Sequence, residues 1–266
     1  MQIAKLTLFH LKVTKKQILA WSVILFSLLF LYMILFPSVK DMAQLKLENM
    51  PKALLQIIGM EDMNQMSTHT GYLSMIYNLF LIVMSIFIAI YSANVLADEE
   101  KHKTIEFLYS LNVSRLDIYL SKVAASFTAL CIVIIASAVS VLTCGFINGG
   151  ETFSFMDTLQ ILKMTALTPF VFMGLGCMLA GAFGKSYCAS LASGVAVLCY
   201  MFGYLSTLMG DKLTFLKYLS PFEMLHPQNV LALDTATVIS MAVYVVVMLL
   251  TIVVGGIFYS KRDLKV

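Results

Sequence analysis

Ionisable side chains gather in one segment of an otherwise apolar sequence. Residues 98–115 read DEEKHKTIEFLYSLNVSR, and ten ionisable residues, counting His102, lie between Asp98 and Lys122. Across the 266 residues only 12% are charged, whereas 60% are hydrophobic. A charge cluster on this background indicates a place where the chain meets water and binds another molecule.

The cluster has the pattern of an exposed helix. No Gly or Pro interrupts residues 99–111, and Ile105, Leu108 and Leu111 fall on one side with charged residues around them. An apolar ridge with charged flanks is typical of a docking surface for a partner protein. The alternative is a connector that lies on the membrane and extends its charged groups into water.

A turn and a second helix are expected after this ridge. Asn112 favours a turn, and Ser114 with Asp117 three residues later forms a capping pattern that opens a helix. Segment 98–122 is therefore predicted to form a helix, a turn and a second helix that enters the next apolar run.

The composition assigns the whole chain to the membrane. A mean hydropathy of +0.88 is too high for a water-soluble domain. A hydrocarbon core about 30 Å thick needs roughly 20 apolar residues in a helix. Six runs without Asp, Glu, Lys, Arg or His meet this length: 18–36, 72–97, 123–147, 164–183, 189–209 and 236–259. We predict an all-α, polytopic protein with six transmembrane helices, because backbone amides in lipid must pair within their own segment.

The distribution of cations predicts the orientation. With the N-terminus inside, 12 of the 18 Lys and Arg residues are cytoplasmic, so both termini are expected in the cytoplasm. Segment 98–122 is then cytoplasmic, and residues 37–71 and 210–235 are external loops. Residues 1–266 are expected to form a single membrane domain. No targeting segment argues against a bacterial plasma membrane.

An interfacial elbow is predicted over residues 1–16. Ile3, Leu6, Phe9 and Val13 share one face, which can lie in the acyl boundary of the inner leaflet. Thr14 is expected to cap a new helix, which lets the chain turn into the first span.

Smaller patterns concern packing and metals. Gly174, Gly176 and Gly181 predict close helix packing in the fourth span, and the fifth span contains the small residues of ASLASGVA. The five cysteines show no CxxC spacing and are interpreted as free thiols. The spacing of Met60, Met63 and Met66 could present thioethers to Cu(I), but packing is the favoured interpretation, and no metal site is predicted.

The charged segment resembles part of a known family. DEEKHKTIEFLYSLNVSRLDIYLSK is similar to the connection between the second and third spans of type-2 ATP-binding-cassette permeases. That connection has an acidic cluster, Gly-Thr-Leu/Ile-Glu, two or three apolar positions, Pro-Val-Ser-Arg, and a Lys that opens the next span. Here Lys103 and Asn112 replace the usual Gly and Pro. LSPFEML at residues 219–225 is similar to a second recurrent stretch of that family.

The resemblance implies a coupling helix that sits in a cleft of a separate ATP-binding subunit. The residues implied to contact that ATPase are Glu99, Glu100, Thr104, Ile105, Glu106, Leu108, Val113, Ser114 and Arg115. Lys122 matches the Lys that opens the third span. ATP and Mg²⁺ would bind to two copies of the partner, and no cofactor to this chain.

The resemblance also implies a pathway between two permease copies, identical or paralogous. Short re-entrant helices between the fifth and sixth spans would cap its external side. By analogy the first, second and fifth spans are the candidate lining. The polar or aromatic members of the second and fifth spans are Tyr77, Asn78, Tyr91, Ser92, Asn94, Tyr200 and Tyr204.

Two features of the sequence itself support this interpretation. No GxxxxGK[ST] motif is present, so the chain is not expected to be an enzyme or to bind nucleotide by a P-loop. The spans carry no ionisable side chain, which disfavours an ion-coupled carrier.

The expected function is that of the membrane subunit of an ATP-driven exporter. Its cargo would be an amphipathic or hydrophobic peptide, lipophilic drug or lipid. The alternative is a non-transporting membrane scaffold or sensor that docks a cytosolic partner. Membrane lipids are expected contacts, and nucleic acid is not.

Overall fold

The computed structural model describes residues 2–46, 67–102, 114–185, 187–209 and 214–262, and all regular structure in them is helical. The long helices are α1 (Gln2–Ile34), α4 (His69–His102), α6 (Arg115–Asn148), α8 (Leu167–Phe183), α9 (Cys188–Met209) and α13 (Thr235–Lys261). The shorter helices are α2 (Phe36–Lys46), η3 (Gly150–Thr152), α7 (Phe155–Thr165), α10 (Phe215–Leu219), α11 (Pro221–Met224) and α12 (Pro227–Ala232).

Among the described residues, six stretches of helix are long and apolar enough to cross a membrane. They are α1 with the start of α2, α4, α6, α7 with α8, α9, and α13. Each contains one of the six predicted spans, so the prediction of a six-span, all-helical membrane protein is confirmed.

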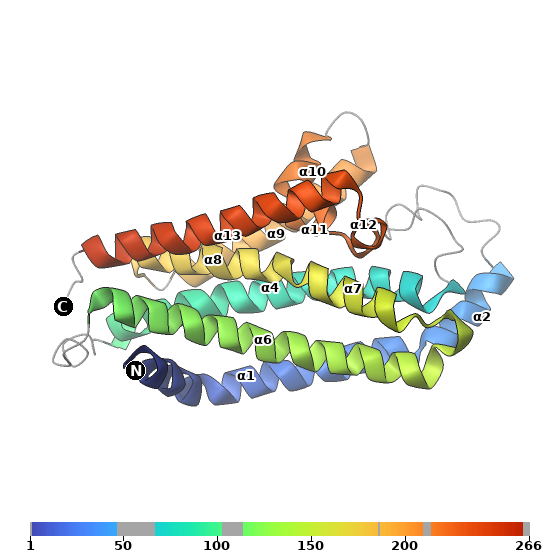
Figure 1. Ribbon diagram of the computed structural model, residues 1–266, viewed down its shortest axis with the longest axis horizontal. Coiled ribbons are helices and arrows are strands. Elements are labelled where there is room, and N and C mark those ends of the chain that lie inside the picture. Colours follow the sequence, from blue (N-terminus) through green and yellow to red (C-terminus); the bar gives the residue numbers. More distant parts are fainter. Residues whose placement is uncertain (1, 47–66, 103–113, 186, 210–213, 263–266) are drawn as a thin grey trace.

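The helices form an elongated bundle in which successive spans run in opposite directions (Figure 1). Helices α1, α6 and α9 begin at the left of Figure 1, and α4, α8 and α13 end there. We call this end, where α1 begins and α13 ends, the termini end. The short helices α2, α10, α11 and α12 lie at the opposite end.

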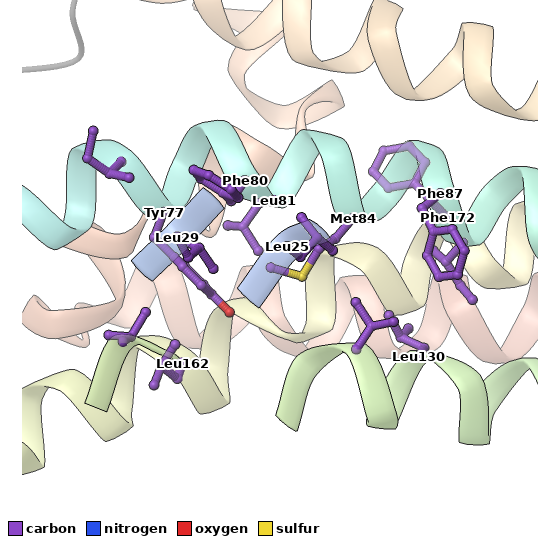
Figure 2. Close-up of a cluster of buried hydrophobic side chains, with 14 of the residues drawn as sticks. Leu25, Leu29, Tyr77, Phe80, Leu81, Met84, Phe87, Leu130, Leu162 and Phe172 are labelled. Atoms are coloured by element: carbon purple, nitrogen blue, oxygen red, sulfur yellow. The ribbon is translucent and has the colours of Figure 1, made fainter. Parts of the chain in front are cut away.

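The bundle has one main hydrophobic core, and α4 is its most enclosed helix. Leu25 and Leu29 of α1 and Leu130 of α6 are buried together with Met84 of α4 and Phe172 of α8 (Figure 2). The outward surface is apolar too, with side chains such as Leu28 and Val246 exposed. An apolar exterior around helices of this length is what lipid requires.

The predicted elbow over residues 1–16 is wrong in one respect, because α1 continues from Gln2 to Ile34 without a turn at Thr14. The Thr14 hydroxyl does not cap a new helix. It donates to the carbonyl oxygen of His10, 2.8 Å away, and its Oγ1 lies 2.8 Å from Oη of Tyr91 in α4. A threonine that bonds to the carbonyl four residues earlier is compatible with a helix interior. The 33 residues of α1 span about 50 Å, more than the hydrocarbon core alone requires.

The fourth span is longer than predicted and is interrupted. It begins at Phe155 in α7 and breaks at Ala166 before α8. Pro169 lies four residues after Thr165, where it cannot donate to the carbonyl of Thr165 and its ring crowds that carbonyl. The proline therefore accounts for the break.

The described parts of the two segments predicted to be external, 37–71 and 210–235, contain short helices. The predicted loop 37–71 starts within α2, and Met60, Met63 and Met66 lie outside the described residues. Between the fifth and sixth spans the chain forms α10, α11 and α12. Ser220 caps α11 before Pro221, and His226 caps α12 before Pro227. Proline at the first helical position and a capping residue before it explain why these helices start there.

Glycines of α8 allow close contact with two neighbouring helices. A Cβ atom on Gly181 would collide with the carbonyl oxygen of Gly255 in α13, and one on Gly176 would collide with Ser92 Oγ in α4. The predicted close packing of the fourth span is confirmed. In the fifth span, Gly194 is exposed and a Cβ on it would meet no atom within 4 Å.

Candidate functional site

The termini end carries the segment predicted to dock a partner. Helix α4 extends to His102 and α6 begins at Arg115, so the two helices flank residues 103–113. Glu99 and Glu100 belong to the last turns of α4. The other predicted contact residues before Ser114 lie outside the described residues: Thr104, Ile105, Glu106, Leu108 and Val113.

Ser114 forms the predicted cap of the helix that enters the third span. Its backbone is extended, and its Oγ accepts a hydrogen bond from the backbone N–H of Asp117 at 3.1 Å. The same hydroxyl donates to Asp117 Oδ2 at 2.7 Å. The capping pair therefore fixes the residue at which α6 begins.

Arg115 bonds to the end of α13. Its Nη1 donates to the carbonyl oxygens of Arg262, at 3.0 Å, and Ser260, at 3.4 Å. Arg262 directly follows α13, and its own Nη1 donates to the carbonyl oxygens of Ala180, at 3.0 Å, and Gly181, at 3.1 Å, near the end of α8. Burial lowers the pKa of Arg262 from its ordinary value, but an arginine remains charged at neutral pH.

Lys122 lies inside the protein. The predicted span began at residue 123, yet Lys122 is fully buried one turn after Ile118 in α6. Its Nζ donates to the carbonyl oxygen of Leu96 in α4 at 3.1 Å and lies 6.0 Å from the ring centre of Tyr259 in α13. A lysine is rarely buried unless its ammonium group has such partners.

Polar residues of α1 also face this end of the bundle. Thr7 Oγ1 donates to the carbonyl oxygen of Ser121 in α6 at 3.2 Å, and Thr14 contacts Tyr91 as described above. His10, between them on the same face, is buried. The start of α1 is therefore tied to α4 and α6 by a polar stripe rather than separated from them.

Sequence reasoning missed the roles of Lys122, Arg262 and His10. The sequence contained two helical patterns that point to Lys122 and His10. Ile118, Lys122 and Ala125 fall on one helical face once the Ser114 cap fixes the start of α6, and Thr7, His10 and Thr14 recur at helical spacing. Arg262 carried no local signal, because its partners lie about 80 residues earlier in the chain.

The candidate pathway residues of α4 are not gathered in one place. Tyr77 is fully buried among hydrophobic side chains such as Leu29 and Leu162 (Figure 2). Tyr91 is buried against Thr14, whereas Asn78 is half-buried and Asn94 is exposed. Ser92 is buried and donates to the carbonyl oxygen of Ala89 at 3.3 Å.

The two candidate tyrosines of α9 lie one turn apart and are half-buried. The Tyr200 ring meets the Phe222 ring of α11 edge-on, with centroids 5.5 Å apart. Tyr77 and Tyr91 are therefore buried in the single chain, whereas the candidates that keep exposed surface are Asn78, Asn94, Tyr200 and Tyr204.

A cavity of about 300 Å³ lies between α13 and the short helices α10 and α11. Its lining residues are Tyr218, Met224, Ala236, Ile239, Ser240, Val243 and Tyr244. Tyr244 Oη donates to the carbonyl oxygen of Tyr218 at 3.1 Å, and Ser240 Oγ donates to that of Ala236 at 2.7 Å. Two of the three hydroxyl side chains in the wall, those of Ser240 and Tyr244, are bonded within the protein, and the remaining lining is mostly apolar, so the cavity suits an apolar group.

Within the part of the chain that the structure describes, no three His, Cys, Asp or Glu side chains are grouped so that they could hold a metal ion. All five cysteines are free thiols, and Cys144, Cys177 and Cys188 are buried.

Comparison with known proteins identifies the family. Residues 7–259 match the family model described as "Multidrug efflux system permease Rv1217c, C-terminal domain". None of the curated proteins compared with the chain matches it. Because the match covers nearly the whole chain and the six helices suit a membrane, the chain is a transmembrane transporter subunit. It belongs to the multidrug efflux permease family defined by the Rv1217c C-terminal domain.

Proposed function

We propose that the chain is the membrane-spanning subunit of an ATP-driven exporter of the type-2 ATP-binding-cassette class. Its cargo is an amphipathic or hydrophobic molecule, such as a lipophilic drug, a peptide or a lipid. Two permease copies, identical or paralogous, work with two ATPase subunits that bind ATP and Mg²⁺.

One observation carries the proposal. Helices α4 and α6 both extend to the termini end, so the described flanks of the charged segment, residues 98–102 and 114–122, lie together at one end of a bundle whose spans are apolar. Helix α4 has 34 residues and is about 50 Å long, which exceeds the hydrocarbon core of about 30 Å. The excess length supports a docking element outside the membrane, on the side that the cation distribution assigns to the cytoplasm.

The family match supports export of lipophilic compounds, since the family is named for multidrug efflux. The apolar cavity beside α13 is consistent with such a cargo. The scaffold hypothesis requires the same docking segment but no transport and no stimulation of ATP hydrolysis, so the two functions differ in a measurable way.

Docking is tested by purifying the tagged protein from its native membranes and identifying its partners by mass spectrometry. We expect an ATPase with a P-loop to accompany the wild type. The double variant Glu106→Ala/Leu108→Ala should lose most of it, because these residues supply the charge and the apolar ridge of the segment. The control is Lys163→Ala, which removes an exposed charge from α7 in the fourth span, outside the charged segment.

Loss of the ATPase from the control variant as well, or its absence from wild-type preparations extracted gently, would contradict the proposal. If an ATPase binds but none of several lipophilic compounds stimulates its hydrolysis of ATP, the scaffold function is favoured instead.

A further inference from the structure

Two arginines at the termini end connect three spans in series. Arg115 joins the first residue of α6 to the carbonyl oxygens at the end of α13. Arg262, which follows α13, joins it in turn to carbonyl oxygens near the end of α8. We call these two side chains and the four carbonyl groups that they bind the arginine anchor. The three helix ends involved lie at the left of Figure 1.

The chemistry of helix ends explains why arginine is found here. The last carbonyl groups of a helix have no N–H partner within the helix, and the helix dipole places partial negative charge on them. A guanidinium group is a permanent cation with a planar set of donors, so it can bind two carbonyl oxygens together. Arg262 binds the Gly181 carbonyl in this way, together with that of Ala180, which also accepts the backbone N–H of Gly184 at 2.8 Å. Arg115 binds the carbonyl oxygens of Ser260 and Arg262.

The three helices joined by the arginine anchor are also in direct contact just inside it. Tyr119 Oη of α6 donates to the carbonyl oxygen of Ile252 in α13 at 2.7 Å. A Cβ atom on Gly255 would lie 2.7 Å from the same Tyr119 oxygen, and Gly181 of α8 packs directly on the Gly255 backbone. Little space remains for α6 to move at this end without α13 and α8.

We propose that Arg115 and Arg262 are positioning residues for transport, which pass movement of segment 98–122 from α6 to α13 and from α13 to α8. The proposal rests on the function proposed above, because it takes that segment as the place where the ATPase acts. Neither residue touches cargo. Their role is to make the third, fourth and sixth spans respond together.

This role for Arg115 differs from the one implied by family resemblance, which places its charge against the ATPase. The two roles predict different behaviour of Arg262, which lies on another helix end and interacts with Arg115 through its backbone carbonyl. If Arg115 acts through α13, removing the Arg262 side chain should reproduce the effect of removing the Arg115 side chain.

The series arrangement, in which Arg115 links α6 to α13 and Arg262 links α13 to α8, is tested first on the purified full-length chain without any ATPase. Backbone amide hydrogen exchange would be compared for wild type, Arg115→Ala, Arg262→Ala and Lys261→Ala. Lys261 is the matched control, because it is an exposed cation in the last turn of α13, the helix that Arg262 follows.

We expect Arg262→Ala to accelerate exchange at the end of α8, and Arg115→Ala to accelerate exchange at the ends of both α13 and α8. Arg115→Ala without any effect on α8 would overturn the series arrangement, and this result does not depend on what the protein transports.

The coupling role is tested on the complex with its ATPase, by measuring cargo moved per ATP hydrolysed. We expect Arg262→Ala to lower this ratio about tenfold, the scale of a typical coupling free energy between sites. The Lys261→Ala variant should leave the ratio unchanged, and Arg262→Lys should restore part of it. The double variant Arg115→Ala/Arg262→Ala should be no worse than either single variant, because links in series fail together.

Two results would overturn the coupling role. One is an unchanged ratio in Arg262→Ala. The other is loss of ATPase binding in Arg115→Ala but not in Arg262→Ala, which would assign Arg115 to the ATPase contact. Variants are compared only if they elute as single species in detergent. An alanine variant that does not elute as a single species is replaced by the lysine variant at the same position, Arg115→Lys or Arg262→Lys. Failure to find an ATPase at all would count against the proposed function, while the exchange experiment would still decide whether the anchor exists.

Discussion

Ser114, Ser154 and Ser220 each precede a helix and accept a hydrogen bond from the backbone N–H three residues later. Arg115 and Arg262 bind the opposite kind of helix end, the carbonyl end. These five polar residues therefore satisfy backbone groups where helices begin or end, whereas hydroxyls such as those of Ser126 and Thr128 bond to carbonyl groups inside their own helix. In an apolar protein this has a large effect, because an unpaired backbone group in a low-dielectric setting costs several kcal/mol.

His226 gives a prediction at the scale of one residue. It caps α12 through Nδ1, which accepts the backbone N–H of Gln228 at 3.4 Å. Burial, with a smaller contribution from the positive charge of Lys217, lowers the pKa of His226 to about 4. The unfolded histidine titrates near 6.5, so between these values the unfolded chain binds more protons than the folded one. The contribution of His226 to stability is complete above pH 6.5 and is lost as the pH falls toward 4, with a ceiling of about 3 kcal/mol.

The measurement is the thermal midpoint in detergent at pH 7.5 and pH 5. His226→Asn keeps a capping oxygen but does not titrate, so its midpoint should fall less than that of the wild type over this interval. Other histidines titrate in both proteins, and their effect cancels in the difference. An equal fall in both proteins would show that His226 is not buried in its neutral form.

At the scale of helices, the long apolar runs were sufficient to predict six spans, since a charge-free stretch of this length crosses lipid as an α-helix. The start of α6 was predictable because Ser114 and Asp117 are neighbours in sequence. The unbroken course of α1 was not, because the Thr14 hydroxyl is satisfied by His10 and by Tyr91 on another helix. The role of Pro169 in breaking the fourth span became clear only once the helix was seen to begin at Phe155.

Helix packing gives a matched pair of predictions. Gly181→Ala places a Cβ atom against the Gly255 carbonyl of α13, where backbone rather than a flexible side chain would have to move. Overpacking of this kind costs roughly 1–3 kcal/mol. Gly194→Ala meets no neighbour within 4 Å and should be neutral or stabilising by up to about 1 kcal/mol.

Thermal midpoints of the two variants, measured in the same detergent, provide the comparison. A lower midpoint for Gly181→Ala with an unchanged or higher midpoint for Gly194→Ala is expected. Equal midpoints would argue against close contact between α8 and α13.

At the scale of the whole molecule, an even number of spans brings the start of α1 and the end of α13 to the same end of the bundle, together with both flanks of segment 98–122 (Figure 1). The position of both termini and both flanks at one end was predictable from the even number of spans. The hydrogen bonds that join the helices at this end were not predictable. Arg262 donates to a backbone carbonyl group of α8, and Lys122 donates to one of α4. Every residue has a backbone carbonyl group, so the residue types do not show which one accepts the hydrogen bond.

The central claim is that this permease moves lipophilic cargo with energy from a separate ATPase. Its most direct test is reconstitution of the purified chain with its co-purified ATPase into lipid vesicles that contain a fluorescent lipophilic dye. We predict dye movement that requires both proteins and hydrolysable ATP, and that stops with a non-hydrolysable analogue. Dye movement at the same rate without ATP, or none with the complete ATPase complex across several lipophilic dyes, would contradict the account.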